Sequence, residues 1–112
     1  MKKTDIDRLR HMIEAAREIR LFTKGKTEDA LRRDRILTLA LVKEIEIIGE
    51  AASKVSQEAR EQIPGIEWQD VIGMRNRLIH AYFEIDESIL WDTVIHDIPK
   101  LIEELEAIPE LQ

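Results

Sequence analysis

Four polar side chains, Arg75, Asn76, His80 and Tyr82, fall within one short segment of the chain. An imidazole has an ordinary pKa of about 6.5, so it can take a proton from a 2′-hydroxyl or give one to a departing 5′-oxygen. A guanidinium can hold the scissile phosphate bidentately and stabilise the charge that develops on it. The amide of Asn76 can orient His80 or bond the phosphate. Arg75, Asn76 and His80 therefore form a candidate site for cleavage of RNA without a metal.

A single histidine cannot easily serve as both acid and base in one reaction, which makes a two-fold homodimer chemically attractive. In such a dimer, two copies of Arg75 and His80 would line one cleft. The spacing alone also fits a second interpretation, in which Arg75 belongs to a satisfied ion pair and His80 to the core. At the level of residue types both interpretations stay open.

The spacing of the other candidate ligands favours neither a metal nor a cofactor. His11 and His96 form no metal-ligand spacing with another histidine or with paired acids, and we expect both at the surface. The acids Glu44, Glu46 and Glu50 lack the Glu-x-x-His partners of a di-iron bundle. The chain has no cysteine, which excludes thiolate ligands, thiolate nucleophiles and disulfides. We expect no metal and no cofactor.

The candidate segment is expected to lie on one helix from about Trp68 to Phe83. At about 100° per residue, Arg75 falls in the middle of the apolar stripe of this helix. The residues around it on that stripe are Val71, Ile72, Leu78, Ile79 and Tyr82. A guanidinium there must be paired or must face a cleft, because an unpaired buried charge costs several kcal/mol. We expect Glu50 as its structural partner.

The same helix would place Asn76 and His80 one turn apart, at the edge of the stripe. Arg77 would point to the opposite, solvent side together with Asp70. We therefore assign no role in cleavage to Arg77.

The remaining pattern predicts an all-α, up-and-down bundle of about five helices, with a kinked C-terminal helix. Cap residues and apolar spacing place the other helices at Thr4 to Gly25, Thr27 to about Val55, Ser56 to Ile63, and from Asp86 onward, where Pro99 kinks or interrupts the last one. The length of 112 residues suits one domain over residues 1–112.

The predicted second helix is apolar on more than one face. The apolar positions in its middle are Leu37, Leu39, Ala40, Leu41, Val42, Ile45, Ile47 and Ile48. Such a helix usually packs on two sides. Burial within one bundle and contact with a second copy both explain the pattern, and both can hold together.

The net charge of -6 argues against a generic nucleic-acid binder, because nonspecific affinity for phosphates is built from Lys and Arg. Any chemistry on RNA must therefore be local. No apolar run approaches the roughly 20 residues that span a bilayer, and the N-terminus has no apolar region of a signal peptide. We expect a cytoplasmic protein without a membrane partner.

The stretch 68–83, followed by 85–86 and 90–94, resembles the HepT family of HEPN-domain proteins. The family hallmark is an Arg, four residues, a His, one residue and a Tyr, and it is present as Arg75, His80 and Tyr82. An Asn directly after the Arg is also usual. The length, the order of helices, the stretch 47–52 and the break at Pro99 fit as well, so the resemblance covers nearly the whole chain.

This resemblance implies a HEPN-like bundle that acts as the ribonuclease toxin of a type VII toxin–antitoxin module. In that family the active site needs no metal and lies at the homodimer interface, and the partner is a minimal nucleotidyltransferase antitoxin, MntA. Carried over, Arg75 and His80 become the catalytic pair and Asn76 their support. Tyr82, the single tyrosine of the chain, becomes the site at which the antitoxin attaches AMP and silences the nuclease.

A second interpretation is a noncatalytic HEPN-like module that docks a nucleotidyltransferase. The retained Arg75 and His80 favour the nuclease, whereas the acidic net charge favours the module. A purely structural bundle would have no need of Arg75 in an apolar stripe.

Overall fold

The computed structural model describes residues 1–80 and 84–112, and this part of the chain is all-helical apart from one isolated antiparallel bridge between Ile79 and Ile85. The predicted all-α class is thus confirmed. The α-helices of the described residues are α1 (Lys3–Thr23), α2 (Glu28–Arg33), α3 (Arg35–Ser53), α4 (Gln57–Glu61), α5 (Trp68–Ile72), α6 (Met74–Leu78), α7 (Glu87–Asp92) and α8 (Ile98–Glu106). A π-helical segment η2 (Thr93–Asp97) joins α7 to α8, and a 3₁₀ turn η3 (Pro109–Leu111) follows.

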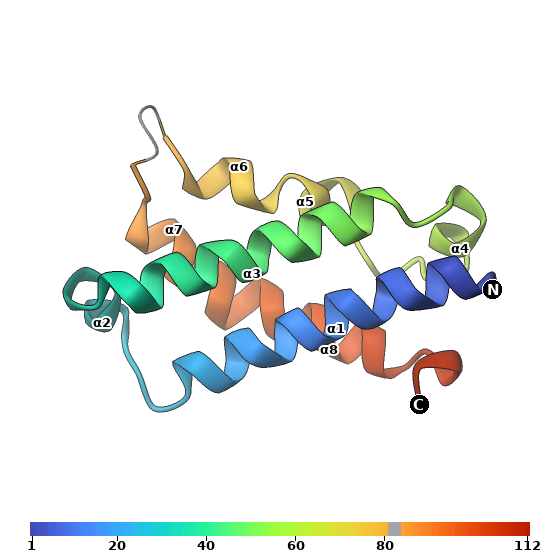
Figure 1. The fold of residues 1–112 in the computed structure, drawn as a ribbon, viewed down its shortest axis with the longest axis horizontal. Helices are drawn as coiled ribbons and strands as arrows, with labels where there is room; N and C mark the ends of the chain where they lie inside the picture. Colours follow the sequence, from blue (N-terminus) through green and yellow to red (C-terminus); the bar gives the residue numbers. More distant parts are fainter. Residues whose placement is uncertain (81–83) are drawn as a thin grey trace.

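The long helices α1 and α3 pack side by side, with α8 against α1 and with α5 and α6 against α3 (Figure 1). Their inner faces carry Leu and Ile at helical spacing, and burial of each such side chain contributes roughly 1.5–3 kcal/mol. The largest fully buried side chains are Leu9, Met12, Ile19, Leu41, Ile45, Ile48, Met74, Leu78, Leu90, Ile98, Ile102 and Leu105. Packing of this core holds α6 next to α3.

The first helix ends as predicted, because α1 stops at Thr23 and Gly25 adopts a positive φ of 73° that suits a residue without a Cβ. Its start is different, since Lys2 and not Thr4 occupies the cap position. Asp5 instead reaches across to the predicted cap Ser56: its two carboxylate oxygens accept from the Ser56 N–H at 2.8 Å and from the Ser56 hydroxyl at 2.7 Å. These bonds tie the start of α1 to the start of α4.

The predicted helix 27–55 is divided at Asp34, which is one reason why five expected helices become eight. Asp34 leaves the helical conformation, with φ −126° and ψ 92°, and its carboxylate accepts from the Leu37 N–H at 3.0 Å. An Asp that caps a new helix competes with continuation of the old one. The apolar periodicity runs through the break and therefore hid it.

The predicted helix 68–83 is also wrong in extent. It divides at Gly73 into α5 and α6, and the chain turns extended at Ile79, with φ −113° and ψ 121°. The His80 N–H then donates to the Glu84 carbonyl at 2.8 Å, and the Asp86 N–H donates to the Leu78 carbonyl at 2.8 Å. These two backbone bonds, which join residues 78 and 80 to residues 84 and 86 of the same chain, replace helical hydrogen bonds. His80 therefore does not lie on the helix that carries Arg75.

Helix α5 lies close to α3 because Gly49 has no side chain. A Cβ on Gly49 would come within 3.1 Å of the Ile72 carbonyl oxygen. The C-terminal end of α5 therefore rests on the backbone of α3, and α6 continues from there along α3. The contact of Gly49 with Ile72 thus sets how closely α6 approaches α3.

The kink expected at Pro99 takes another form. The backbone stays helical from α7 into α8 but widens into a π-helical turn at Thr93–Asp97, and Pro99 occupies the first turn of α8. Proline has no N–H to donate to the carbonyl four residues earlier, which accounts for a local change of hydrogen-bond pattern at this point. None of the helices in residues 1–80 and 84–112 is both long and apolar enough to cross a membrane.

Candidate active site

Arg75 lies on α6 and pairs with an acid of α3. Its Nε is 3.8 Å from Oε2 of Glu46, and its Nη1 donates to Oδ1 of Asn76 at 3.4 Å. The expected partner Glu50 was the wrong acid, since it pairs with Lys54 at 3.4 Å, one turn further along α3. Of the two situations predicted for Arg75, an ion pair or a cleft, the structure shows an ion pair, with Glu46 in the place of Glu50.

Arg75 lies at the edge of the apolar stripe of α6 and not in its middle. The buried face of α6 is formed by Met74 and Leu78, whereas the Arg75 side chain is 36% exposed. A salt bridge of this length and exposure contributes at most about 1 kcal/mol. A phosphate can therefore displace Glu46 from the guanidinium at little cost.

His80 lies two residues beyond the end of α6, with its side chain 55% exposed. Its Nε2 is 3.4 Å from Oδ2 of Asp86. The predicted helical neighbourhood of Asn76 and His80 is wrong, because α6 ends at Leu78. In the described part of the chain, no hydrogen bond or ion pair joins His80 to Arg75 or Asn76.

Asp86 is the residue that the sequence did not reveal as part of the site. Its role as the cap of α7 was predicted and is confirmed, since Oδ1 accepts from the Ile89 N–H at 3.0 Å. The backbone N–H of Ile89 and then the ring of His80 hold the pKa of the Asp86 carboxyl below its ordinary value. The predicted cap could have indicated this second contact, because a carboxylate that caps a helix uses one oxygen for the cap and leaves the other free to contact a neighbouring side chain.

Tyr82 lies outside the described residues, so the structure gives no geometry for it. Asn76 is exposed on α6 directly beside Arg75. The structure thus brings together Arg75 with Asn76, and separately His80 with Asp86. Both pairs belong to the segment that runs from α6 into the cap of α7.

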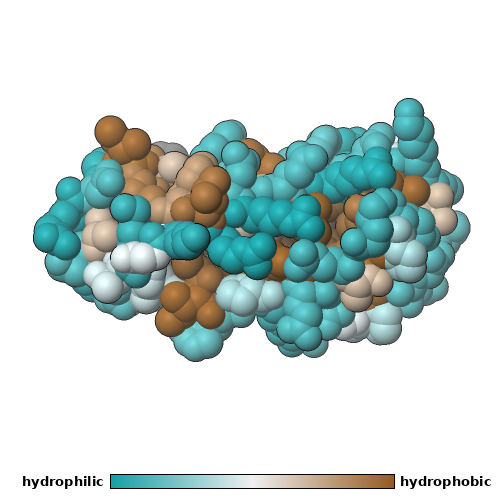
Figure 2. Space-filling view, turned by 90° about the horizontal axis from the view of Figure 1, so that it is seen from below, coloured by the Kyte–Doolittle hydropathy of each residue, from teal (hydrophilic) through white to brown (hydrophobic). Residues whose placement is uncertain are grey.

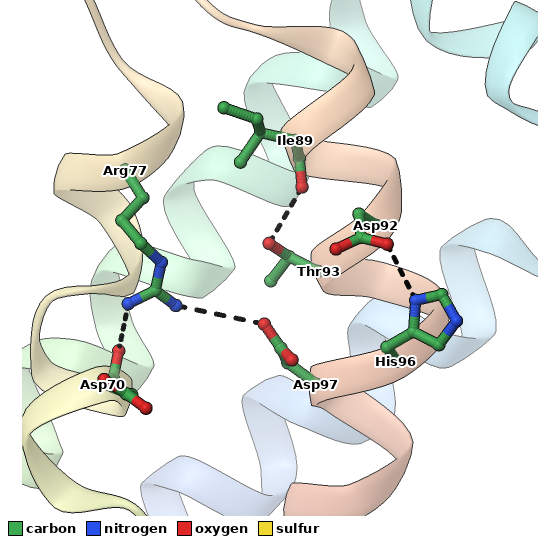
Figure 3. Close-up of polar contacts among 7 residues, drawn as sticks. All are labelled: Asp70, Arg77, Ile89, Asp92, Thr93, His96 and Asp97. Atoms are coloured by element: carbon green, nitrogen blue, oxygen red, sulfur yellow. Dashed lines mark hydrogen bonds and ion pairs between the residues drawn. The ribbon is translucent and has the colours of Figure 1, made fainter.

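Arg77 is exposed and lies beside Asp70, as predicted. Figure 3 shows its guanidinium between Asp70 and Asp97: Nη1 donates to the Asp70 carbonyl at 3.0 Å, and Nη2 is 3.9 Å from Oδ2 of Asp97. Arg77 and both acids line a cavity of about 230 Å³ between α5, α6 and α8. These contacts give Arg77 a structural role that ties α5 and α6 to η2.

The two remaining histidines are exposed, as predicted. Nδ1 of His96 lies 2.8 Å from Oδ1 of Asp92, one turn away on the same helical path (Figure 3). Among residues 1–80 and 84–112, no group of three or more His, Asp or Glu side chains is placed to hold a metal ion.

The sequence matches the family described as Ribonuclease HepT-like over residues 12–108. The chain belongs to the HepT-like ribonuclease family. The resemblance drawn from the Arg75 to Tyr82 segment is thereby confirmed.

Similar proteins support this family membership across almost the full length. The chain is 37% identical to "Probable ribonuclease HepT" of Thermococcus cleftensis over an alignment of 101 residues, and this alignment covers 90% of this chain and 92% of the relative. It is 35% identical over 109 residues to "Putative RNase MJ1380" of Methanocaldococcus jannaschii, which covers 96% of this chain and 100% of the relative. No solved structure matches the chain significantly.

Proposed function

We propose that this HepT-like protein is an endoribonuclease that cleaves RNA without a metal, with Arg75, Asn76 and His80 as its catalytic residues. One observation carries the proposal. All three side chains reach solvent, so His80 is not a core histidine and the guanidinium of Arg75 is open to a ligand. The salt bridge of Arg75 is long enough to yield to a phosphate, and among the described residues His80 is contacted at one ring nitrogen, Nε2.

The chemistry follows from these positions. His80 takes the proton of a 2′-hydroxyl, the 2′-oxygen attacks the adjacent phosphorus, and the 5′-oxygen leaves with a proton from an acid. The products are a 2′,3′-cyclic phosphate and a free 5′-hydroxyl. Arg75 binds the phosphate oxygens and stabilises the charge that develops on them, and Asn76 holds Arg75 or donates to the phosphate.

The same proposal includes a homodimer, in which a second His80 supplies the acid. In the described structure the bundle buries most of the apolar positions of α3, but Leu39 stays 47% exposed and Ile36, at the start of α3, 82% exposed. Figure 2 shows hydrophobic surface toward the end of the molecule at which α2 lies. Burial within the bundle thus explains one face of α3 and leaves another for a partner.

This exposed strip leads to the site. Ile36, Leu39, Lys43 and Glu46 recur at intervals of three and four residues on one face of α3, and Glu46 is the residue that contacts Arg75. A second copy that covers Leu39 would therefore extend to Arg75. In such a dimer the two copies of the site would lie at the interface, where acid and base can come from different protomers.

We further propose that the protein is the toxin of a toxin–antitoxin module, silenced by a minimal nucleotidyltransferase of the MntA type that attaches AMP to Tyr82. Tyr82 is two residues from His80 along the chain, so a nucleotide there stays within reach of the site. Its phosphate would compete with RNA for Arg75 through the same charge-assisted bonds.

Cleavage of RNA by the purified protein in EDTA tests the proposal. We expect wild-type activity to survive EDTA, and His80→Ala and Arg75→Ala each to lower the rate by about 100-fold or more. Matched controls are His96→Ala, which removes another exposed histidine paired with an Asp, and Arg77→Ala; both should keep the activity.

For Tyr82, intact mass after co-expression with the antitoxin should show added AMP, and an unchanged mass would exclude the modification.

The alternative is a noncatalytic module that docks the nucleotidyltransferase. The net charge of -6 favours it, because RNA is repelled by an acidic surface. A protein that binds the nucleotidyltransferase but neither cleaves RNA nor inhibits growth would establish the module.

A further inference from the structure

The carboxylate of Asp86 contacts two different parts of the molecule at once. Its Oδ1 accepts from the Ile89 N–H at 3.0 Å and so caps α7, while its Oδ2 lies 3.4 Å from Nε2 of His80. The first bond fixes the side chain to a helix that is anchored in the core through the fully buried Leu90. The second oxygen therefore has a defined position relative to the His80 ring.

The backbone places His80 and Asp86 as diagonal neighbours on an antiparallel ladder. The Asp86 N–H donates to the Leu78 carbonyl at 2.8 Å, and the His80 N–H donates to the Glu84 carbonyl at 2.8 Å. Between these bonds lies the Ile79–Ile85 bridge, with Ile85 buried. This narrow ladder forms the base of the segment 78–86 and sets the separation of His80 from Asp86.

From this geometry we propose that Asp86 is a positioning residue for His80: it accepts the Nε2–H and thereby leaves Nδ1 as the nitrogen that exchanges protons with RNA. The proposal rests on the proposed ribonuclease function. A neutral imidazole carries its proton on one nitrogen only, and the hydrogen bond at that nitrogen decides which tautomer is populated. A carboxylate is acceptor-only when ionised, so it selects the Nε2–H form.

The carboxylate acts a second time when the ring takes up a proton. The imidazolium formed after attack by the 2′-oxygen has both nitrogens protonated, and the negative Asp86 stabilises it through the bond that already exists at Nε2. The depressed pKa of the Asp86 carboxyl keeps this charge in place. Asp86 thus orients the base and stabilises its charged form without touching RNA.

His96 provides an internal reference for the tautomer. There, Nδ1 and not Nε2 is the nitrogen next to a carboxylate, at 2.8 Å from Oδ1 of Asp92. In the ¹⁵N-labelled full chain at about pH 8.5, where an imidazole of ordinary pKa is neutral, the two rings should give opposite ¹⁵N patterns. We expect the Nε2–H form for His80 and the Nδ1–H form for His96. An Nδ1–H form of His80 in the wild type would overturn the proposal, whether or not the protein cleaves RNA.

Two variants separate positioning from capping. Asn and Ser are both good N-caps, so Asp86→Asn and Asp86→Ser keep α7, but neither presents a carboxylate to His80. We expect the rate of RNA cleavage to fall about tenfold to a hundredfold in each, with KM for RNA unchanged and with a mixed tautomer at His80. Wild-type rates in both variants would overturn the proposal.

Asp34→Asn is the matched control, because Asp34 caps α3 in the same way and contacts no histidine among the described residues. It should leave both the rate and the His80 tautomer unchanged. The proposed ribonuclease function and the role of Asp86 can be contradicted separately. A wild type without ribonuclease activity contradicts the proposed function, while the tautomer measurement still decides on Asp86.

Discussion

Arg75 and Glu46 face each other across the contact of α6 with α3, with Nε and Oε2 3.8 Å apart. Lys43 lies on the other side of Glu46, with 3.4 Å between Nζ and Oε1. Glu46 thus neutralises two cations that an RNA phosphate would also attract. This relationship makes Glu46 a local competitor of the substrate.

Glu46→Gln should therefore strengthen the interaction with RNA. We expect KM for an RNA substrate to fall about two- to fivefold, because Arg75 and Lys43 lose a competing charge, and the unfolding free energy to change by less than about 1 kcal/mol. Steady-state kinetics at fixed ionic strength measures the first quantity. Glu50→Gln, which removes the partner of Lys54, is the control. An increased KM in Glu46→Gln would show that Glu46 helps to hold Arg75 for the substrate.

The exposed strip on α3 predicts the effect of a charge at Leu39. Leu39→Asp should convert the proposed dimer to a monomer and lower RNA cleavage with it, because a carboxylate would be buried against a partner without a counter-charge. Sedimentation velocity measures the first effect. Ile95→Asp, at a similarly exposed Ile on η2, is the matched control and should stay dimeric. A wild type that sediments as a monomer at micromolar concentration would contradict the shared site.

Glu44 predicts an unusual dependence of stability on pH. Its side chain on α3 is buried, with 8% exposed, and burial followed by contact with the Glu18 carboxyl raises its pKa to about 7 from the ordinary 4.5. Between these two values the folded state holds a proton that the unfolded state has lost, so the stabilisation is complete below about pH 4.5 and is lost as the pH rises to about 7.

Glu44→Gln should remove this dependence, because an amide does not ionise. Denaturant titrations at several pH values should show that wild type loses roughly 3 kcal/mol relative to Glu44→Gln across this window. Glu50→Gln, at an exposed position of the same helix, should follow the wild-type curve. Parallel curves for wild type and Glu44→Gln would contradict a protonated Glu44.

The contact of Asp5 with Ser56 predicts a loss of stability in Asp5→Ala. The carboxylate accepts two bonds from Ser56 and is 4% exposed, so its removal leaves the Ser56 N–H without its partner and costs roughly 2 kcal/mol. Although burial opposes ionisation, these bonds outweigh it and lower the pKa of Asp5, so the contribution is present at neutral pH and lost in acid. Asp29→Ala, at an exposed salt bridge with Arg33, should change stability by less than about 0.5 kcal/mol.

The sequence predicted the helical class and the ends of several helices, because caps such as Ser56 and Asp86 are local signals. It missed the breaks at Asp34 and Gly73, where the apolar period continues across a change of direction. It also extended the α6 helix through His80, because the hydrogen bonds that end it come from residues 84 and 86. Periodicity within a segment carries no information on such partners.

In the candidate site, too, the local features were predicted and the contacts between distant segments were not. The polar residues of the Arg75 to Tyr82 segment were found from their types. The need of Arg75 for a partner was predicted from a place in the middle of the apolar stripe, although the structure puts Arg75 at the edge of that stripe. The identity of that partner depends on how α6 lies on α3, which is set by the contact of Ile72 with Gly49. Helix-to-helix register of this kind is a property of the packed structure, so Glu46 could not be told from Glu50.

The central claim is that His80 and Arg75 cleave RNA without a metal. Its most direct test is the rate of RNA cleavage by purified wild type in EDTA, measured beside His80→Ala and the matched His96→Ala, with the fold of each checked by circular dichroism. We expect full activity in wild type and in His96→Ala, and a loss of about 100-fold or more in His80→Ala. Equal activity in all three, or none in a folded and dimeric wild type, would contradict it.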